Sequence, residues 1–122
     1  MANQKTVPAS SRGKTERDTG PLLAALGDGT RRDIVERLRA GPRTVGDLSK
    51  LLPVSRPAVS QHLKVLRDAG IVVETRSGVR HYFALDATAL DHLRRHFERL
   101  WQDVLSRFAD YVKEAERARK RK

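Results

Sequence analysis

The sequence predicts a mainly α-helical domain with one small β-hairpin. Three observations indicate this fold class: a length that suits one domain, a series of short apolar stripes with helical spacing, and one pair of β-branched runs late in the chain. Of the 122 residues, 39% are hydrophobic but only 5% are aromatic, so the core is small and aliphatic. Such a core favours a chain that buries further surface against a second copy of itself.

The charge of the chain indicates a polyanionic partner. Lys and Arg number 25 against 15 Asp and Glu, which gives a net charge of +10 and a pI near 10.8. Nucleic acid is expected ahead of an acidic protein or a membrane surface. The chain has no cysteine, which excludes disulfides and thiolate metal sites. No segment suits a membrane span or a signal peptide, and we expect a cytoplasmic protein.

Composition divides the chain into three parts. Residues 1–20 are polar and rich in Ser, Thr, Lys and Gly, so we expect a flexible N-terminal arm. Residues 21–112 form the expected folded domain. Residues 113–122 form a basic C-terminal tail that is typical of a frayed helix end. Either terminal part could contact phosphates or simply raise solubility.

Gly and Pro divide the domain into short helices. An apolar segment begins at Pro21 and ends before Gly27. Thr30 and Asp33 have the spacing of a capping box, which predicts the start of a second helix. That helix is expected to end at Gly41, because glycine followed by proline marks a turn.

The next two helices are expected to lie close together. Thr44 and Asp47 repeat the capping-box spacing and begin a third helix, which Pro53 ends. Only Pro53 and Val54 separate that helix from Ser55, the expected N-cap of the fourth. Two short helices joined by so tight a turn are typical of a helix-turn-helix, and a generic helical hairpin is the alternative.

The helix expected over residues 55–69 has two different faces. Pro57 suits its first turn, and Gly70 suits its end. An apolar stripe with helical spacing can be buried, and it consists of Ala58, Val59, Leu63 and Leu66. The opposite face carries groups that suit phosphates and base edges, namely Arg56, Ser60, Gln61 and Lys64. An ordinary surface helix with a solvated basic face is the alternative.

Two β-branched and aromatic runs follow, over residues 71–76 and 79–85. Ser77 and Gly78 between them are a turn signal, so we expect a β-hairpin. A hairpin directly after a helix-turn-helix is a wing. Arg76 and Arg80 flank its tip, where they could reach a minor groove or nearby phosphates. Incidental arginines on a solvated tip are the alternative.

The last helix is expected from about Asp86 to Val112, and it keeps an apolar stripe over about five turns. We interpret this stripe as the seam of a homodimer, because a small wing domain does not need so much apolar surface. A core role within one chain is the alternative. The residues assigned to the seam are Leu22, Leu23 and Leu26 of the first helix and Leu93, Phe97, Leu100, Trp101, Val104 and Phe108 of the last.

Together these segments resemble the ArsR/SmtB family of bacterial winged-helix repressors. The resemblance covers about residues 21–112 and rests on Ala-Leu-Gly-Asp-Gly-Thr-Arg-Arg-Asp-Ile-Val, Val-Gly-Asp-Leu and Ser-Arg-Pro-Ala-Val-Ser-Gln-His-Leu-Lys-Val-Leu-Arg-Asp-Ala-Gly. It implies a winged helix-turn-helix homodimer that represses transcription from a palindromic operator. Residues 55–69 would enter the major groove, and residues 71–85 would lie at the minor groove or phosphates. The resemblance also implies four DNA-facing residues, namely Arg56, Ser60, Gln61 and Lys64. The predicted DNA-binding set adds Pro57, His62, Arg76 and Arg80 to these, although the spacing of His62 from Val59 and Leu66 also puts it at the edge of the buried stripe.

The sequence departs from the family at both of its best-known metal sites. Where arsenic and cadmium sensors resemble Cys-Val-Cys-Asp-Leu, this chain has Thr-Val-Gly-Asp-Leu over residues 44–48. The zinc site on the last helix would begin at Asp91, but the other three positions hold Leu93, Val104 and Arg107. We therefore predict no metal and no cofactor. The alternative is a metal-responsive repressor that uses a non-standard site built on His92 and His96, with Asp103 or a second subunit.

Catalysis is not expected. Neither Asp91 with Asp103 nor Ser60 with His62 lies in a nucleophile turn or a closed pocket motif. The prediction is a sequence-specific DNA-binding regulator, and the resemblance leaves room for an effector other than a metal. A sequence-tolerant architectural DNA-binding protein is a further alternative that the net charge would also suit.

Overall fold

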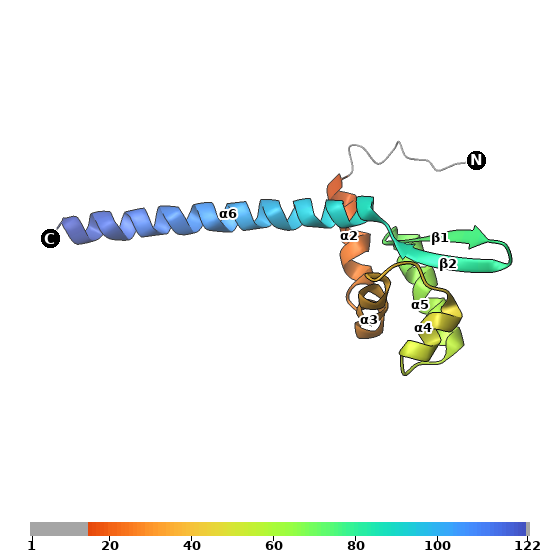
Figure 1. Ribbon diagram of the computed structural model, residues 1–122. Coiled ribbons are helices and arrows are strands. Elements are labelled where there is room, and N and C mark those ends of the chain that lie inside the picture. The colour runs from red at the N-terminus through yellow and green to blue at the C-terminus, as the bar shows by residue number, and fades with distance from the viewer. Residues whose placement is uncertain (1–14, 122) are drawn as a thin grey trace.

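The computed structural model describes residues 15–121 as five helices and one hairpin, with no third strand in that range. Four short helices and the hairpin pack together into a body, and a long straight helix projects from it (Figure 1). The elements are α2 (Thr15–Ala25), α3 (Gly29–Leu38), α4 (Val45–Leu51), α5 (Arg56–Ala69), β1 (Val72–Ser77), β2 (Arg80–Leu85) and α6 (Ala87–Lys120).

Both ends of the folded part extend beyond the predicted boundaries. The first helix begins at Thr15 instead of Pro21, and Pro21 lies inside it. Thr19 is buried, so the folded part begins before Pro21, and the arm predicted over residues 1–20 is too long. Its remaining part, residues 1–14, lies outside the described residues. At the other end, α6 continues through the predicted tail to Lys120 without a break.

The start of α3 corrects one sequence prediction. Its N-cap is Asp28, whose Oδ2 accepts a hydrogen bond from the backbone N–H of Arg31 at 3.0 Å. Thr30 already lies within the helix, so the predicted capping box of Thr30 and Asp33 is wrong. The reason is local, because Asp28 is itself a strong capping residue and stands two positions earlier.

The caps predicted for α4 and α5 are confirmed. Thr44 and Asp47 form a reciprocal capping box, in which each side chain accepts a hydrogen bond from the other residue's backbone N–H. The Ser55 hydroxyl accepts from the N–H of Ala58 at 3.2 Å. Gly70 ends α5 with φ +95°, a left-handed conformation that favours glycine.

The hairpin forms one residue later than its sequence suggests. β1 and β2 pair antiparallel, with Val72 opposite Leu85 at the base and Ser77 opposite Arg80 at the tip. The two-residue loop is therefore Gly78 and Val79, and not Ser77 and Gly78. Gly78 has φ +65°, as tight two-residue hairpin loops require.

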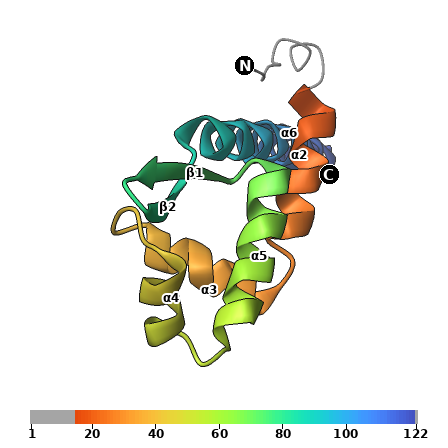
Figure 2. The ribbon, with the colours of Figure 1, turned by 90° about the vertical axis from the view of Figure 1, so that its right-hand side faces the viewer.

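One apolar core joins the helices to the base of the hairpin. α2 packs against α5 and α6, and α3 and α4 pack against α5 (Figure 2). Arg43, just before α4, exchanges two backbone hydrogen bonds with Phe83 of β2, at 3.0 and 2.8 Å. The fully buried members of the core are Ile34, Leu48, Val59, Leu63, Leu66, Ile71 and Val72.

Candidate nucleic-acid interface

The two faces predicted for α5 are present. Val59, Leu63 and Leu66 are buried in the core, whereas the residues on the other face are exposed. Ser60 and Gln61 make no side-chain hydrogen bond within residues 15–121, so their polar groups are available to a ligand. The first turn of α5 contains no acidic residue, and the positive end of the helix dipole is therefore not neutralised there.

Arg56 of α5 and Lys50 of α4 lie beside a cavity of about 550 Å³ between α4, the start of α5 and the hairpin. A Cβ atom on Gly46 would lie 3.5 Å from Nη1 of Arg56, so the guanidinium rests over this glycine. The sequence pattern did not single out Lys50. Lys50 lies in the last turn of α4 and faces away from buried Leu48. This spacing could have identified it as an exposed cation from the sequence. Both cations suit phosphate contact.

Lys64 is exposed but has a partner within α5. Its Nζ lies 2.9 Å from Oδ2 of Asp68, and this hydrogen bond holds the pKa of the Asp68 carboxyl below its ordinary value. More than half of each side chain is exposed, and exposed pairs of this kind contribute little stability. Lys64 can therefore exchange this partner for a phosphate at small cost.

His62 points to another part of the structure than Ser60 and Gln61 do. Its Nδ1 lies 3.5 Å from Nη1 of Arg31 and 3.9 Å from Oδ2 of Asp28, and its side chain is 24% exposed. The hydrogen bond from the Arg31 backbone N–H is the main cause that holds the pKa of the Asp28 carboxyl below its ordinary value. His62 thus contacts the start of α3 and is less exposed than Ser60 and Gln61, and its assignment to the DNA-facing set stays a prediction.

The two arginines of the hairpin flank its tip, as predicted, and both are exposed. Arg76 stands opposite His81, and Arg80 stands opposite Ser77. Successive positions along a strand point to opposite faces of a sheet. Arg76 and Arg80 therefore start from opposite faces of the hairpin, which allows the tip to contact a strand of DNA on either side.

The long helix α6 exposes a continuous apolar face. At about 100° per residue, its exposed apolar residues fall within an arc of about 140°. Trp101 is 58% exposed, and Phe97, Leu100, Val104 and Phe108 are also exposed, as expected for a seam that a second chain covers. The full set is Leu90, Phe97, Leu100, Trp101, Val104, Leu105, Phe108, Tyr111 and Val112.

Three of the predicted seam residues have another position. Leu22 and Leu93 are 3% and 7% exposed and belong to the core of their own chain, and Leu26 is half-buried against that core. Of the three leucines from the first helix, Leu23 alone is exposed. The sequence pattern could not separate these roles, because the packing of α2 against α6 appears only in the folded chain.

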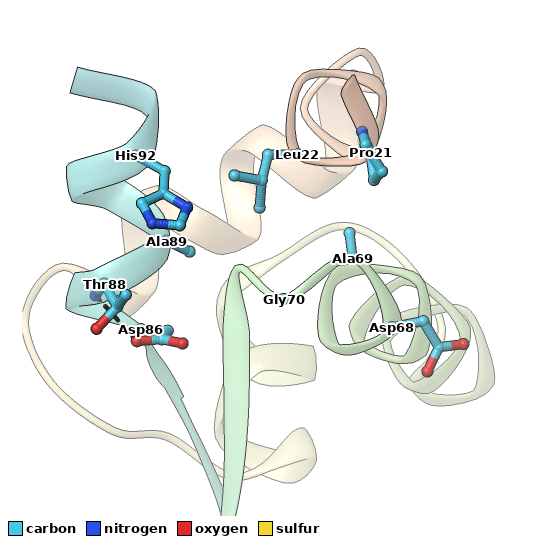
Figure 3. Close-up of a pocket in the computed structure, with 9 residues that line it drawn as sticks. All are labelled: Pro21, Leu22, Asp68, Ala69, Gly70, Asp86, Thr88, Ala89 and His92. Carbon is cyan, nitrogen blue, oxygen red and sulfur yellow. Dashed lines mark hydrogen bonds between the residues drawn. The ribbon is translucent and has the colours of Figure 1, made fainter. Parts of the chain in front are cut away.

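A smaller cavity, of about 330 Å³, lies where α2, the end of α5 and the start of α6 meet (Figure 3). Leu22, Ala69 and Ala89 give it apolar walls, and His92 stands at its edge. Asp86 nearby is the N-cap of α6, because its Oδ1 accepts from the N–H of Thr88 at 3.0 Å.

The positions that correspond to the family's metal sites do not fit a metal. Thr44 is engaged in a helix cap, the Arg56 guanidinium covers Gly46, and Leu93 is buried in the core. Across residues 15–121 the structure contains no group of three or more His, Asp or Glu side chains that could hold an ion. No helix in the same range is long and apolar enough to cross a membrane.

Comparison with known proteins identifies the arrangement. Residues 28–73, from the cap of α3 to the start of β1, match the family described as bacterial regulatory protein, arsR family. The HTH-type transcriptional regulator Rv2034 of Mycobacterium tuberculosis is 52% identical over 98 residues, which cover 80% of this chain and 92% of that protein. The chain belongs to the ArsR family. Its fold is a winged helix-turn-helix, with α4 and α5 as the helix-turn-helix and β1 and β2 as the wing.

Other ArsR relatives agree with this assignment. The repressor SmtB of M. tuberculosis is 40% identical over 93 residues, 76% of this chain and 69% of that protein. An ArsR-like regulator from Rhodococcus sp. RHA1 superimposes with a TM-score of 0.71 at 29% identity, over 78% of this chain and 90% of the other. These relatives are transcriptional regulators and not enzymes, in agreement with the sequence prediction.

Proposed function

We propose that this regulator is a repressor that binds a palindromic DNA operator as a homodimer. The observation that supports the proposal best is the outer face of α5, where Ser60 and Gln61 are exposed and free of internal partners within residues 15–121, beside the cation of Arg56. Such a helix can enter a major groove and present donors and acceptors to base edges. The repressor names of relatives support the direction of regulation.

The contacts divide by chemistry. Gln61 can pair its amide with an adenine edge, and Ser60 can bond to several bases. Arg56 and Lys64 suit guanine or phosphate, and Pro57 fixes the first turn that presents them. Arg76 and Arg80 of the wing act mainly through charge, at phosphates or in the minor groove.

The dimer rests on α6. Its apolar face is too wide and too far from the body for its own chain to cover, and a second copy offers the same face. A two-fold dimer places the two recognition helices in half-sites about 34–36 Å apart, one turn of duplex. Because its target would be bacterial DNA, this proposal also places the protein in the cytoplasm.

The signal that releases the operator is proposed to be non-metallic, because both family metal positions carry other residues. No cofactor is needed for the binding described above.

Selection of bound fragments from genomic DNA tests this function. We expect the wild-type protein to enrich a palindrome and to prefer it over random duplex by about a thousandfold or more. Equal affinity for all duplexes would instead support a sequence-tolerant architectural protein, and failure to bind any duplex would refute the proposal.

A further inference from the structure

One carboxylate joins the recognition helix to both strands of the wing. Oε1 of Glu74 accepts a hydrogen bond from Nη1 of Arg67 at 2.8 Å, and Oε2 lies 2.6 Å from Nδ1 of His81. Arg67 lies in the last turn of α5, Glu74 in β1 and His81 in β2. A single side chain on β1 therefore contacts both neighbouring elements, α5 and β2.

The carboxylate is well matched to this position. The Glu74 side chain is 27% exposed, less than those of Arg67 and His81. Hydrogen bonds from His81 and then from Arg67 hold the pKa of the Glu74 carboxyl below its ordinary value, so the group is ionised at neutral pH. Hydrogen bonds to an ionised group that is partly shielded from water are stronger than hydrogen bonds between neutral groups.

Little else fixes the outer half of the wing. A two-stranded hairpin alone is marginally stable. Val72 and Phe83 anchor its base in the core, but every residue from 73 to 81 has an exposed surface. Within residues 15–121, the bond between Arg67 and Glu74 is the only ion pair that joins the wing to a helix. At the level of Glu74, β2 is also held by the two backbone hydrogen bonds between Arg43 and Phe83, which stands opposite Glu74. The contact with Arg67 is the one that links β1 to α5 through charged side chains, so the angle between the wing and α5 depends in part on it.

We propose that Glu74 is a positioning residue that holds the wing at a fixed angle to the recognition helix and so sets how Arg76 and Arg80 meet DNA. Arg76 follows Glu74 by two positions on the same strand, and its cross-strand neighbour is His81. Fixing Glu74 and His81 therefore fixes the backbone that carries Arg76. A wing ordered in advance loses less conformational freedom on binding, which raises affinity. The DNA part of this inference rests on the proposed function.

The test compares Glu74→Ala with Glu36→Ala. Both variants remove one negative charge, but Glu36 makes its ion pair within the α3 segment, with Arg39 at 3.0 Å, and has no ion pair with the wing within residues 15–121. General electrostatics predicts that both variants bind DNA as tightly as the wild type or more tightly. If Glu74 positions the wing, Glu74→Ala should instead bind DNA more weakly than the wild type, and Glu36→Ala should not.

The first measurement needs no DNA. The full-length variants are digested with trypsin, and cleavage after Arg76 and Arg80 is followed by mass spectrometry. We expect cleavage at these two sites to be about fivefold faster in Glu74→Ala, because the tip opens more often, and unchanged in Glu36→Ala. Equal rates in the two variants would overturn the inference whether or not the protein binds DNA.

The second measurement uses two labelled duplexes, one selected by the wild-type protein and one of random sequence and equal length. We expect Glu74→Ala to bind the selected duplex about fivefold more weakly and with a flatter dependence on salt, because the wing no longer meets the phosphates well. Affinity equal to that of Glu36→Ala would contradict the proposal. If the wild type binds neither duplex, the proposed function fails, and the trypsin result still decides the role of Glu74.

A more conservative substitution at Glu74 distinguishes a loosened wing from general unfolding of the protein. Glu74→Gln keeps one acceptor oxygen and the shape of the side chain, so an intermediate cleavage rate at an unchanged thermal midpoint is expected. A rise in cleavage that occurs only together with a lower thermal midpoint in both Glu74 variants would indicate a stability role in place of positioning.

Discussion

His62 Nδ1 lies 3.9 Å from Oδ2 of Asp28, so the recognition helix contacts the N-terminus of α3 through a residue that the sequence places among the DNA-facing positions. The contact gives two neighbours on one helix different surroundings. The Gln61 side chain is exposed, whereas the His62 side chain lies against Asp28 and Arg31 at the start of α3.

The first prediction follows from that contact. His62→Ala should lower the free energy of unfolding by about 0.5–1 kcal/mol, because it removes a partly exposed polar contact with Asp28 and Arg31. Its ratio of affinities for operator and random duplex should stay within about twofold of the wild type, since every base-reading side chain is retained. Chemical denaturation and DNA titration measure the two effects. A loss of preference at one operator position would instead show that His62 reads a base.

The second prediction concerns the dimer. Trp101→Arg places a charge at the centre of the apolar face of α6, and removing a buried aromatic side chain costs about 3–5 kcal/mol before the charge is counted. Light scattering at micromolar concentration should show a dimer for the wild type and a monomer for the variant. Gln102→Arg adds the same side chain one position away, outside the apolar arc, and should remain dimeric. A Trp101→Arg monomer with full operator affinity would argue against a two-fold complex.

The third prediction concerns metal ions. Zinc, nickel, cadmium and arsenite should change operator affinity little, because Thr44, Gly46 and Leu93 occupy positions where metal-sensing relatives need ligands. DNA titrations with and without each ion measure the coupling. A change above about tenfold, equal to a coupling near 1.4 kcal/mol, that disappears in the double variant His92→Ala, His96→Ala would show a non-standard metal site.

The fourth prediction concerns acid stability. The backbone N–H of Thr44 donates to Asp47 and is the main cause that holds its pKa below the ordinary value of 3.8. Because the folded-state pKa is depressed, this contribution to stability is complete above about pH 3.8 and is lost as the pH falls through the lower folded-state pKa. The thermal midpoint of the wild type should therefore exceed that of Asp47→Asn at about pH 6, and the difference should shrink toward about pH 2.5.

The exposed Asp33 provides the matched control for that measurement. It makes no side-chain hydrogen bond within residues 15–121, so Asp33→Asn removes the same charge without removing a cap and should change the thermal midpoint little at about pH 6. A constant difference between the wild type and Asp47→Asn at every pH would mean that the ionised cap does not contribute.

Local chemistry explains what the sequence could predict. Ser55, Thr44 and Gly70 act on backbone groups within three or four residues, so their roles follow from spacing alone. The alternation of buried and exposed residues along α5 follows from its period in the same way. The ArsR fold was predictable because these local signals agree with one another.

The errors arose where a residue depends on distant parts of the chain. The polar composition of residues 1–20 suggested an arm that ends before Pro21, but α2 begins at Thr15, and both Thr19 and Leu22 on that helix are buried. The bonds of Glu74 to Arg67 and His81 require the strand register, and the sequence prediction placed the loop one residue early. Leu93 could not be distinguished from Phe97 because the point where α6 leaves the body is a property of the packed structure.

The last prediction separates the recognition helix from the wing by the kind of loss that each substitution causes. Gln61→Ala should cost about 1–3 kcal/mol on the operator, relax the preference at one position in each half-site and leave random duplex bound nearly as before, because it removes a hydrogen bond to a base edge. Gln102→Ala, which removes an amide from α6, is the control and should change neither affinity.

Arg80→Ala should weaken binding to both duplexes, because a phosphate contact does not depend on sequence. It should also flatten the dependence of log affinity on log salt by about one unit for each phosphate that the variant no longer neutralises, since fewer counterions are released. Arg99→Ala removes the same charge from α6 and should leave the salt slope nearly unchanged. Equal losses on operator and random duplex for both Gln61→Ala and Arg80→Ala, with no palindrome in the bound fragments, would favour architectural binding, because α5 would then contribute charge and no base reading.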